Sequence, residues 1–238
     1  MKSQTINLLK KEITLGNSAQ TLIWFICAIG MNFIPSYPVY IGPFYITLAI
    51  MMTFALNQSS HDILYTVLLP VRKIDTVKAR FLYCGLLEVI VLLASVIIAV
   101  LKHKLHFPQN KAGIDLTIAY LGLQMIVFAV FNFIFLGNVY KDPHKPGLRY
   151  LIAAIVYFIV YAICELPMWS YFHFNSLLVD GKIDSLPSLA KIGLMLNAKE
   201  GPLLTKQCIV LLCGLLIFAG SWALTFRRAA RQFEKYDM

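Results

Sequence analysis

The stretch from Ile13 to Ser60 contains no aspartate, glutamate, lysine or arginine, and it constrains the fold more than any other feature. A helix needs roughly 20 apolar residues to cross about 30 Å of hydrocarbon, so this stretch is long enough for two crossings. A Pro-Ser-Tyr-Pro run at 35–38 interrupts it near the middle and favours a turn over continuous helix. We therefore predict two transmembrane helices, over about 18–35 and 39–57, joined by a tight hairpin.

Four further apolar stretches follow, at about 81–101, 116–138, 150–171 and 207–226. Their only charged residues are Glu88 and Glu165. Hydrophobic residues make up 59% of the 238 residues, which exceeds the roughly 45–50% of soluble domains. The apolar residues come in blocks rather than in alternation, which favours helices over strands. We predict an all-α integral membrane protein in which 1–238 is a single transmembrane domain with six transmembrane helices.

Lysine and arginine are distributed unevenly between the two sides that six spans would create. Of the 21 Lys and Arg residues, 14 fall on the side of both termini and 7 on the other side. Because positive loops favour the cytoplasm, we expect cytoplasmic N and C termini and a multi-pass protein of the cell (cytoplasmic) membrane. The basic residues form no contiguous patch, so no nucleic-acid partner is expected. The first 15 residues do not resemble a signal peptide, and the first span is expected to remain in the membrane.

The N-terminal arm, residues 1–17, has the pattern of a helix that lies on the membrane surface. Ile6, Leu9 and Ile13 are spaced at i, i+3 and i+7, and Lys10 is among the basic residues around them. This spacing places the apolar side chains on one face of a helix. We predict an amphipathic interface helix there.

The segment 58–80 is predicted to be a helix–break–helix at the cytoplasmic surface. Ser60 or Asp62 can cap the start of the first helix. Leu64 and Leu68 then belong to an apolar stripe at helical spacing, and Pro70 stops that helix.

The second half of the same segment is strongly charged. Arg72 and Lys73 precede a second helix, on which Asp75 and Lys78 are three residues apart on the polar side. Apolar and charged faces together suit docking to a partner protein. The alternative interpretation is that the basic residues only anchor the neighbouring spans at the cytoplasmic surface.

The segment 172–205 is long for a membrane loop and has apolar residues of its own, among them Leu186, Leu189 and Ile192. We predict that it forms one or two short helices across the outer mouth of the bundle.

The sequence lacks three common motifs of catalytic sites. The sequence contains no GxxxxGK[ST] phosphate-binding loop, no HExxH and no GxSxG, so it gives no support for an enzyme. Any energy from ATP must then arrive through a partner subunit. His103 and His106 are three residues apart, but no third ligand accompanies them, and no metal site or cofactor is predicted. The five cysteines lie in apolar spans and are expected to be free thiols.

Two acids lie inside predicted spans, where a charge costs about 3 kcal/mol or more. Glu88 and Glu165 could both line a substrate path. Alternatively, Glu88 pairs with a basic residue of the inner surface, and Glu165 reaches the outer interface. Pro167 is expected to bend or end the helix beside Glu165 and to open that site to water.

The run LPVRKIDTVK at Leu69–Lys78 resembles the cytoplasmic loop between the second and third spans of ABC-2 type transporter permeases. The layout of six spans, an amphipathic arm and a long outer segment is similar to that family throughout the chain. The serine that usually precedes the Arg-Lys pair is absent here, and the family's acid at the end of the second span is replaced by Asn57-Gln-Ser-Ser60. The small size is similar to that of permeases that export amphipathic or antimicrobial peptides, such as the phenol-soluble-modulin exporters.

The resemblance implies an ABC-2 (type V exporter-like) half-transporter. Two separate ABC ATPase subunits would bind the ATP and magnesium, and the chain would pair with itself or with a paralogous permease in the lipid bilayer. The amphipathic peptide substrate would leave the cytoplasm or inner leaflet, and the N-terminal arm would brace the coupling loop. The implied coupling residues are Asp62, Leu64, Leu68, Pro70, Val71, Arg72, Lys73 and Asp75.

Two other classes of function fit the same sequence. A secondary transporter or channel would work without an ATPase, although broken helices in corresponding halves are not evident. A peptide-immunity or sensor protein would bind peptides without moving them.

Overall fold

The structure, a computed structural model, describes residues 2–16, 18–60, 65, 71–141, 145–177, 186–199 and 201–235. These residues form helices and no strand. The helices are α1 (Lys2–Gly16), α2 (Ala19–Gly30), η1 (Met31–Phe33), α3 (Ile41–Ser59), α5 (Lys73–Lys104), α6 (Ile118–Ile134), η2 (Val139–Lys141), α7 (Pro146–Leu177), α8 (Ser188–Asn197) and α9 (Leu203–Glu234).

Five helical stretches of the described residues are long and apolar enough to cross a bilayer. They are Ile41–Ser59, Lys73–Lys104, Ile118–Lys141, Pro146–Asn175 and Leu203–Glu234. A sixth is obtained if Thr5–Gly16 and Ala19–Phe33, which are bent by 79° relative to each other, are taken as one broken span. The prediction of an all-α, multi-pass membrane protein is therefore confirmed, with five to six candidate spans.

The helix at the first predicted span is shorter than expected. The sequence predicted helix over 18–35, whereas α2 and η1 together end at Phe33 and cover fewer residues than the roughly 20 that cross a bilayer. The later helices are longer than the predicted spans: α5, α7 and α9 each contain 32 residues. Their extra turns carry polar and charged residues, which the hydropathy pattern assigned to loops.

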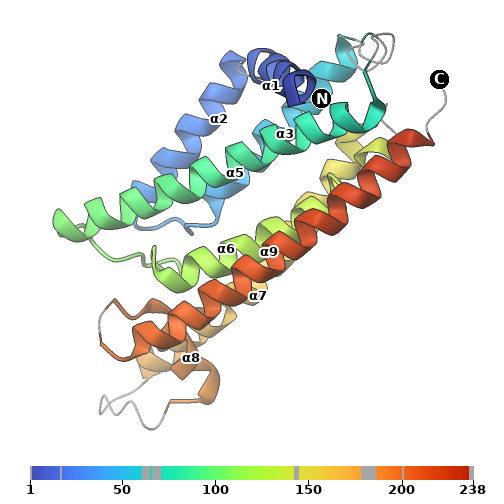
Figure 1. Cartoon of the computed structure of the whole chain (residues 1–238). Coiled ribbons are helices and arrows are strands. Elements are labelled where there is room, and N and C mark those ends of the chain that lie inside the picture. Colours follow the sequence, from blue (N-terminus) through green and yellow to red (C-terminus); the bar gives the residue numbers. More distant parts are fainter. Residues whose placement is uncertain are drawn as a thin grey trace.

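The helices form two groups, visible in Figure 1. One group contains α1, α2, α3 and α5, and the other contains α6, α7, α8 and α9. The groups meet where α5 contacts α9 and where α3 contacts α7. The N and C termini lie at the same end of the bundle, which we call the termini end, and α8 lies at the opposite end (Figure 1).

Helices α6 and α9 pack more closely than side chains normally allow, because glycines meet at their crossing. A Cβ atom on Gly122 would lie 2.5 Å from the carbonyl oxygen of Val210, and one on Gly214 would overlap the backbone of Gly122. Small residues at such crossings let the backbones of membrane helices approach one another.

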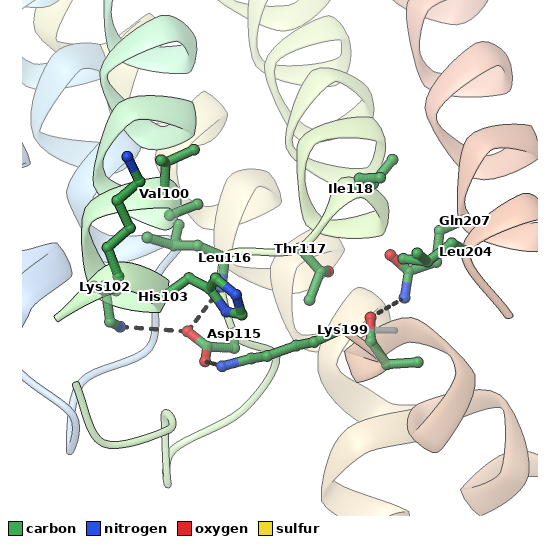
Figure 2. A pocket seen from close by; sticks show the side chains of 13 residues that line it. Val100, Lys102, His103, Asp115, Leu116, Thr117, Ile118, Lys199, Leu204 and Gln207 are labelled. Atoms are coloured by element: carbon green, nitrogen blue, oxygen red, sulfur yellow. Dashed lines mark hydrogen bonds and ion pairs between the residues drawn. The ribbon is translucent and has the colours of Figure 1, made fainter. Parts of the chain in front are cut away.

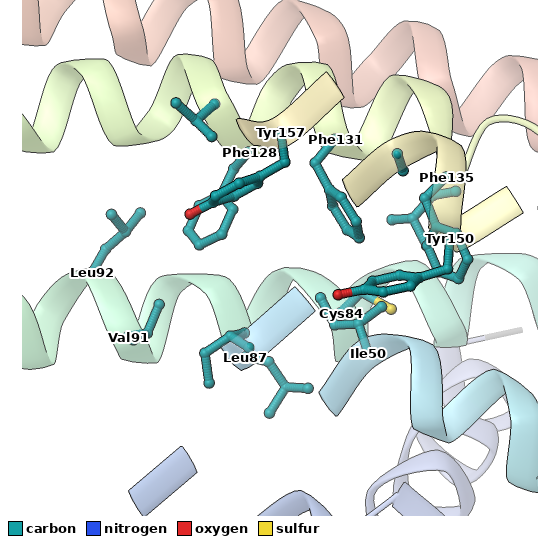
Figure 3. Close-up of a cluster of buried hydrophobic side chains, with 14 of the residues drawn as sticks. Ile50, Cys84, Leu87, Val91, Leu92, Phe128, Phe131, Phe135, Tyr150 and Tyr157 are labelled. Carbon is teal, nitrogen blue, oxygen red and sulfur yellow. The ribbon is translucent and has the colours of Figure 1, made fainter. Parts of the chain in front are cut away.

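Aromatic side chains fill the core between the two groups. Phe131 and Phe135 of α6 stack with ring centroids 5.5 Å apart, and Tyr150 of α7 packs edge-on against both. Figure 3 shows these rings facing the aliphatic side chains of α5, such as Leu87. All of them are buried, so in this conformation the aromatic residues form a packed core.

The outward faces of α5, α7 and α9 are apolar. Exposed residues on them include Leu93, Ile97, Leu151, Ile155, Ile163, Leu212 and Leu216. In water these faces would be a large apolar surface, whereas in a bilayer they contact lipid or another membrane helix.

Candidate functional site

Helix α1 lies along α5 at the termini end. Of the predicted apolar face, Leu9 and Ile13 pack against the core, whereas Ile6 is 52% exposed. Lys10 is exposed. The helix is therefore docked to the bundle through part of its apolar face.

A buried ion pair joins α1 to α5, and the sequence did not predict it. Nε of Arg80 donates to Oε1 of Glu12 across 3.3 Å, and both side chains are at most 4% exposed. The Arg80 guanidinium also lies over the Phe54 ring, 5.7 Å from its centroid. Glu12 is the single acid of α1, and this was the one feature of the sequence that could have drawn attention to it. The sequence positions of Glu12 and Arg80 give no indication that the two residues are in contact.

Part of the predicted coupling segment lies outside the described residues, including Asp62, Leu64, Leu68 and Pro70. Val71 is partly exposed, Arg72 is the N-cap of α5, and Lys73 is the first residue of that helix.

A bidentate ion pair stabilises the start of α5. Arg72 donates to both carboxylate oxygens of Asp75, with distances of 2.9 and 3.2 Å. The hydrogen bond from Arg72 and the charge of Asp75 raise the pKa of the guanidinium. The sequence placed Asp75 beside Lys78 on a polar face. In the structure Asp75 is instead 7% exposed, and it accepts hydrogen bonds from Arg72, the arginine that precedes the helix.

Glu88 is fully buried in α5 and accepts a hydrogen bond of 2.9 Å from Nδ2 of Asn132 on α6. This contact links the two helix groups in the middle of the bundle. The predicted pairing with a basic residue of the inner surface is not the arrangement observed. With 0% exposure, the carboxyl group also does not face an open path in this conformation.

Glu165 of α7 is fully buried and holds the loop before α6. Its Oε2 accepts a hydrogen bond of 2.9 Å from the backbone N–H of Ile114. A Cβ atom at Gly113 would overlap the carboxyl group, so a larger residue there would displace the Glu165 side chain. Trp169, one turn further along α7, donates to the carbonyl of Ala112 over 3.0 Å. The loop is thus fastened to α7 at two points.

Pro167 was expected to bend or end the helix and to open this site to water; the helix does not end there, and the site is not open to water. Helix α7 continues through Pro167 to Leu177, and Glu165 is 0% exposed. Helix α8 covers this turn, since Gly193 packs against the Pro167 carbonyl. Neighbouring helices commonly support a proline within a membrane helix in this way.

A pocket of about 340 Å³ lies at the α8 end, between the end of α5 and the beginnings of α6 and α9 (Figure 2). A charged cluster, Lys102, Asp115 and Lys199, forms its floor. Oδ1 of Asp115 lies 3.3 Å from Nζ of Lys102, and Oδ2 lies 2.8 Å from Nζ of Lys199. Burial alone raises the pKa of Asp115, but its hydrogen bonds and the two ammonium groups outweigh this and lower it overall.

Polar side chains fix the walls of this pocket. Gln207 of α9 donates to the carbonyls of Met195 and Ala198 at the end of α8, over 2.8 and 2.7 Å. Thr117 donates to the Leu196 carbonyl over 2.9 Å and also caps α6. Carbonyl groups at the end of α8, which a helix leaves without partners of its own, thereby receive hydrogen bonds.

From the sequence, Lys102 and Lys199 were counted only among the seven basic residues on the side opposite the termini, and Asp115 was not singled out. The members of the charged cluster lie in three separate segments, so only the fold brings them together. His103 lines the pocket, but among the described residues no group of three His, Cys, Asp or Glu side chains is placed to hold a metal ion.

Comparison with protein-family models, with curated proteins and with solved structures finds no match for this chain in any of the three. The sequence and the structure therefore carry the functional inference by themselves.

Proposed function

We propose that the chain is the permease subunit of an ATP-driven ABC exporter of the ABC-2 type, which moves amphipathic or hydrophobic peptides out across the cytoplasmic membrane. A separate ATPase subunit, present in two copies, supplies the energy. The run at Leu69–Lys78 and the layout of the helices support this proposal.

The observation that carries the proposal is the buried pair of Glu12 and Arg80. Arg80 is the last residue of the predicted coupling segment, and it is also part of α5. A force applied to this segment therefore acts on α1 through the ion pair and on α5 directly. Helix α5 borders both the core and the pocket at the α8 end. A displacement of α5 at the termini end would therefore be transmitted along this continuous helix to the opposite end.

Charge supports a cytoplasmic location for the termini end. Helix α9 ends there with an exposed basic group of Arg227, Arg228 and Arg231. Oδ1 of Asn138 accepts a hydrogen bond of 2.7 Å from Arg228. Clusters of this kind favour the cytoplasmic side of a membrane.

The apolar outward faces of α5, α7 and α9 support a half-transporter that pairs with a second copy or a paralogue. A dimer would cover part of these faces, and lipid would cover the rest.

Co-purification tests the proposal. The tagged chain is expressed in a membrane host with the ABC ATPase encoded beside it, and the retained ATPase is quantified. In one variant Pro70–Lys73 is replaced by a Gly-Ser stretch of equal length. In the matched control, residues 141–144 are replaced in the same way, because six spans would place them on the same side.

Stoichiometric retention that is lost in the first variant and kept in the control supports the permease and its docking loop together. Absence of the ATPase from the well-folded parent protein would contradict the proposal. The channel and peptide-sensor functions would then be tested by peptide flux and by peptide binding without ATP.

A further inference from the structure

The pocket at the α8 end continues into an apolar groove. A second pocket, of about 190 Å³, shares Ala99, Val100 and Ile118 with the first and extends to Ser95 and Leu121. The two pockets together run from the charged cluster along α5 toward the middle of the bundle. Seven residues separate Ser95 from Lys102, which corresponds to roughly 10 Å along a helix. One end is thus charged and the other apolar.

The charged end carries an excess of positive charge. Lys102, Lys104 and Lys199 line it, and Asp115 is the only acid among the described residues that line it. The Asp115 carboxylate forms ion pairs with two of these ammonium groups, those of Lys102 at 3.3 Å and Lys199 at 2.8 Å. Lys102 and Asp115 are at most 8% exposed, whereas Lys199 is 37% exposed. The buried pair therefore fixes the floor, and Lys199 and Lys104 are accessible to an incoming anion.

The apolar end suits a hydrocarbon chain. An apolar cavity of about 150 Å³ holds a benzene ring, so a groove of about 190 Å³ holds a short stretch of acyl chain. A helical peptide, roughly 10–12 Å across with its side chains, is too wide for it. Val96 and Val100 on its rim are 40% and 50% exposed, so the groove opens sideways, where lipid would surround the bundle.

We propose that this site binds an anionic phospholipid. Its phosphate lies beside Lys104 and Lys199, and one acyl chain enters the groove between α5 and α6. The inference does not depend on the proposed export function, because it requires only the membrane and the two adjoining pockets.

Native mass spectrometry of the purified full-length chain tests the head-group contact. Phosphatidylglycerol and phosphatidylcholine with identical acyl chains are titrated separately, and inorganic phosphate is titrated as a third ligand. We expect phosphatidylglycerol to bind at least tenfold more tightly than phosphatidylcholine. A lysine near a membrane surface contributes roughly fivefold to such binding, so K104Q/K199Q is expected to remove most of the preference. K111Q is the matched control, because Lys111 is an exposed lysine of the same end that does not line the pocket.

A second pair of variants tests the groove. Ala99→Phe fills it, whereas Ile97→Phe adds the same ring to a side chain that is 61% exposed and faces away from the pocket. We expect phosphatidylglycerol binding to fall in the first variant only, with both proteins retaining the parent melting temperature. Equal binding of the two lipids, an equal loss in K111Q, or unchanged binding in A99F would each overturn the proposal. Inorganic phosphate that binds as tightly as the lipid would identify a solute site instead.

Discussion

At the scale of single residues, the pair of Glu12 and Arg80 makes the sharpest energetic prediction. Removing one member of a buried ion pair leaves an uncompensated charge and typically costs about 3–5 kcal/mol. We expect E12Q and R80M each to lower the free energy of unfolding in detergent by roughly 3 kcal/mol. The double variant is expected to cost clearly less than the two losses combined, because it leaves no lone buried charge.

The control for this cycle is K10Q. Lys10 lies on the same helix as Glu12, but it is exposed. Exposed charges contribute about 0–1 kcal/mol, so this variant should change stability little. Losses that simply add in E12Q/R80M would contradict a coupled pair and indicate that each residue acts through other contacts.

The sequence identified the two acids inside the helix bundle but not the contacts that hold them. Glu88 and Glu165 were singled out because charges in apolar spans are expensive, and both are indeed fully buried. Their partners, Asn132 and the Ile114 backbone, lie 44 and 51 residues away and became visible only in the fold. Hydropathy reports the cost of a buried group, but it does not identify the contact that offsets that cost.

At the scale of helices, a helix is present at every span that hydropathy predicted, but most of these helices end at other residues than predicted. The ends of α5 and α9 carry polar residues that a hydropathy pattern assigns to loops, although their backbone remains helical. In α7, Pro167 suggested a break, yet packing against α8 lets the helix continue. Hydropathy and helix propensity describe a segment in isolation, whereas packing against neighbouring helices decides at which residue a helix ends.

The crossing of α6 and α9 provides a test at this scale. A methyl group on Gly214 would overlap the backbone of Gly122. We therefore expect G214A to force the helices apart and to lower the free energy of unfolding by about 1–3 kcal/mol. Gly220, also in α9, is the matched control, because a Cβ atom there meets no neighbour within 4 Å.

Alanine at position 220 should be neutral or slightly stabilising, since alanine favours helix over glycine by about 0.5–1 kcal/mol. Thermal unfolding of the two variants in the same detergent gives the comparison. Equal melting temperatures for G214A and G220A would show that the close crossing does not limit stability.

At the scale of the whole molecule, the two helix groups are joined unequally along their length. Toward the termini end, Phe81 of α5 packs against Trp222 and Phe226 of α9, with ring centroids 5.5 Å apart in both pairs. Toward the α8 end, the pockets lie between α5 and the helices of the other group, and the ion pair of Lys102 with Asp115 bridges them. A rotation of one group about the aromatic contact would therefore change the spacing chiefly at the α8 end.

Distance measurement between spin labels tests whether the groups move as units during the proposed ATP cycle. Labels at Lys104 of α5 and Lys206 of α9 report across the groups, and labels at Leu189 of α8 and Lys206 report within one group. Each pair of labels is attached in a variant without the native cysteines. With the ATPase bound, trapping ATP is expected to shift the first distance by more than about 2 Å, while the second distance stays constant. Because α8 and α9 are in contact within one group, a shift of both distances would indicate rearrangement inside that group. Two unchanged distances would mean that ATP does not separate the groups, and the rigid-group mechanism of export would have to be abandoned.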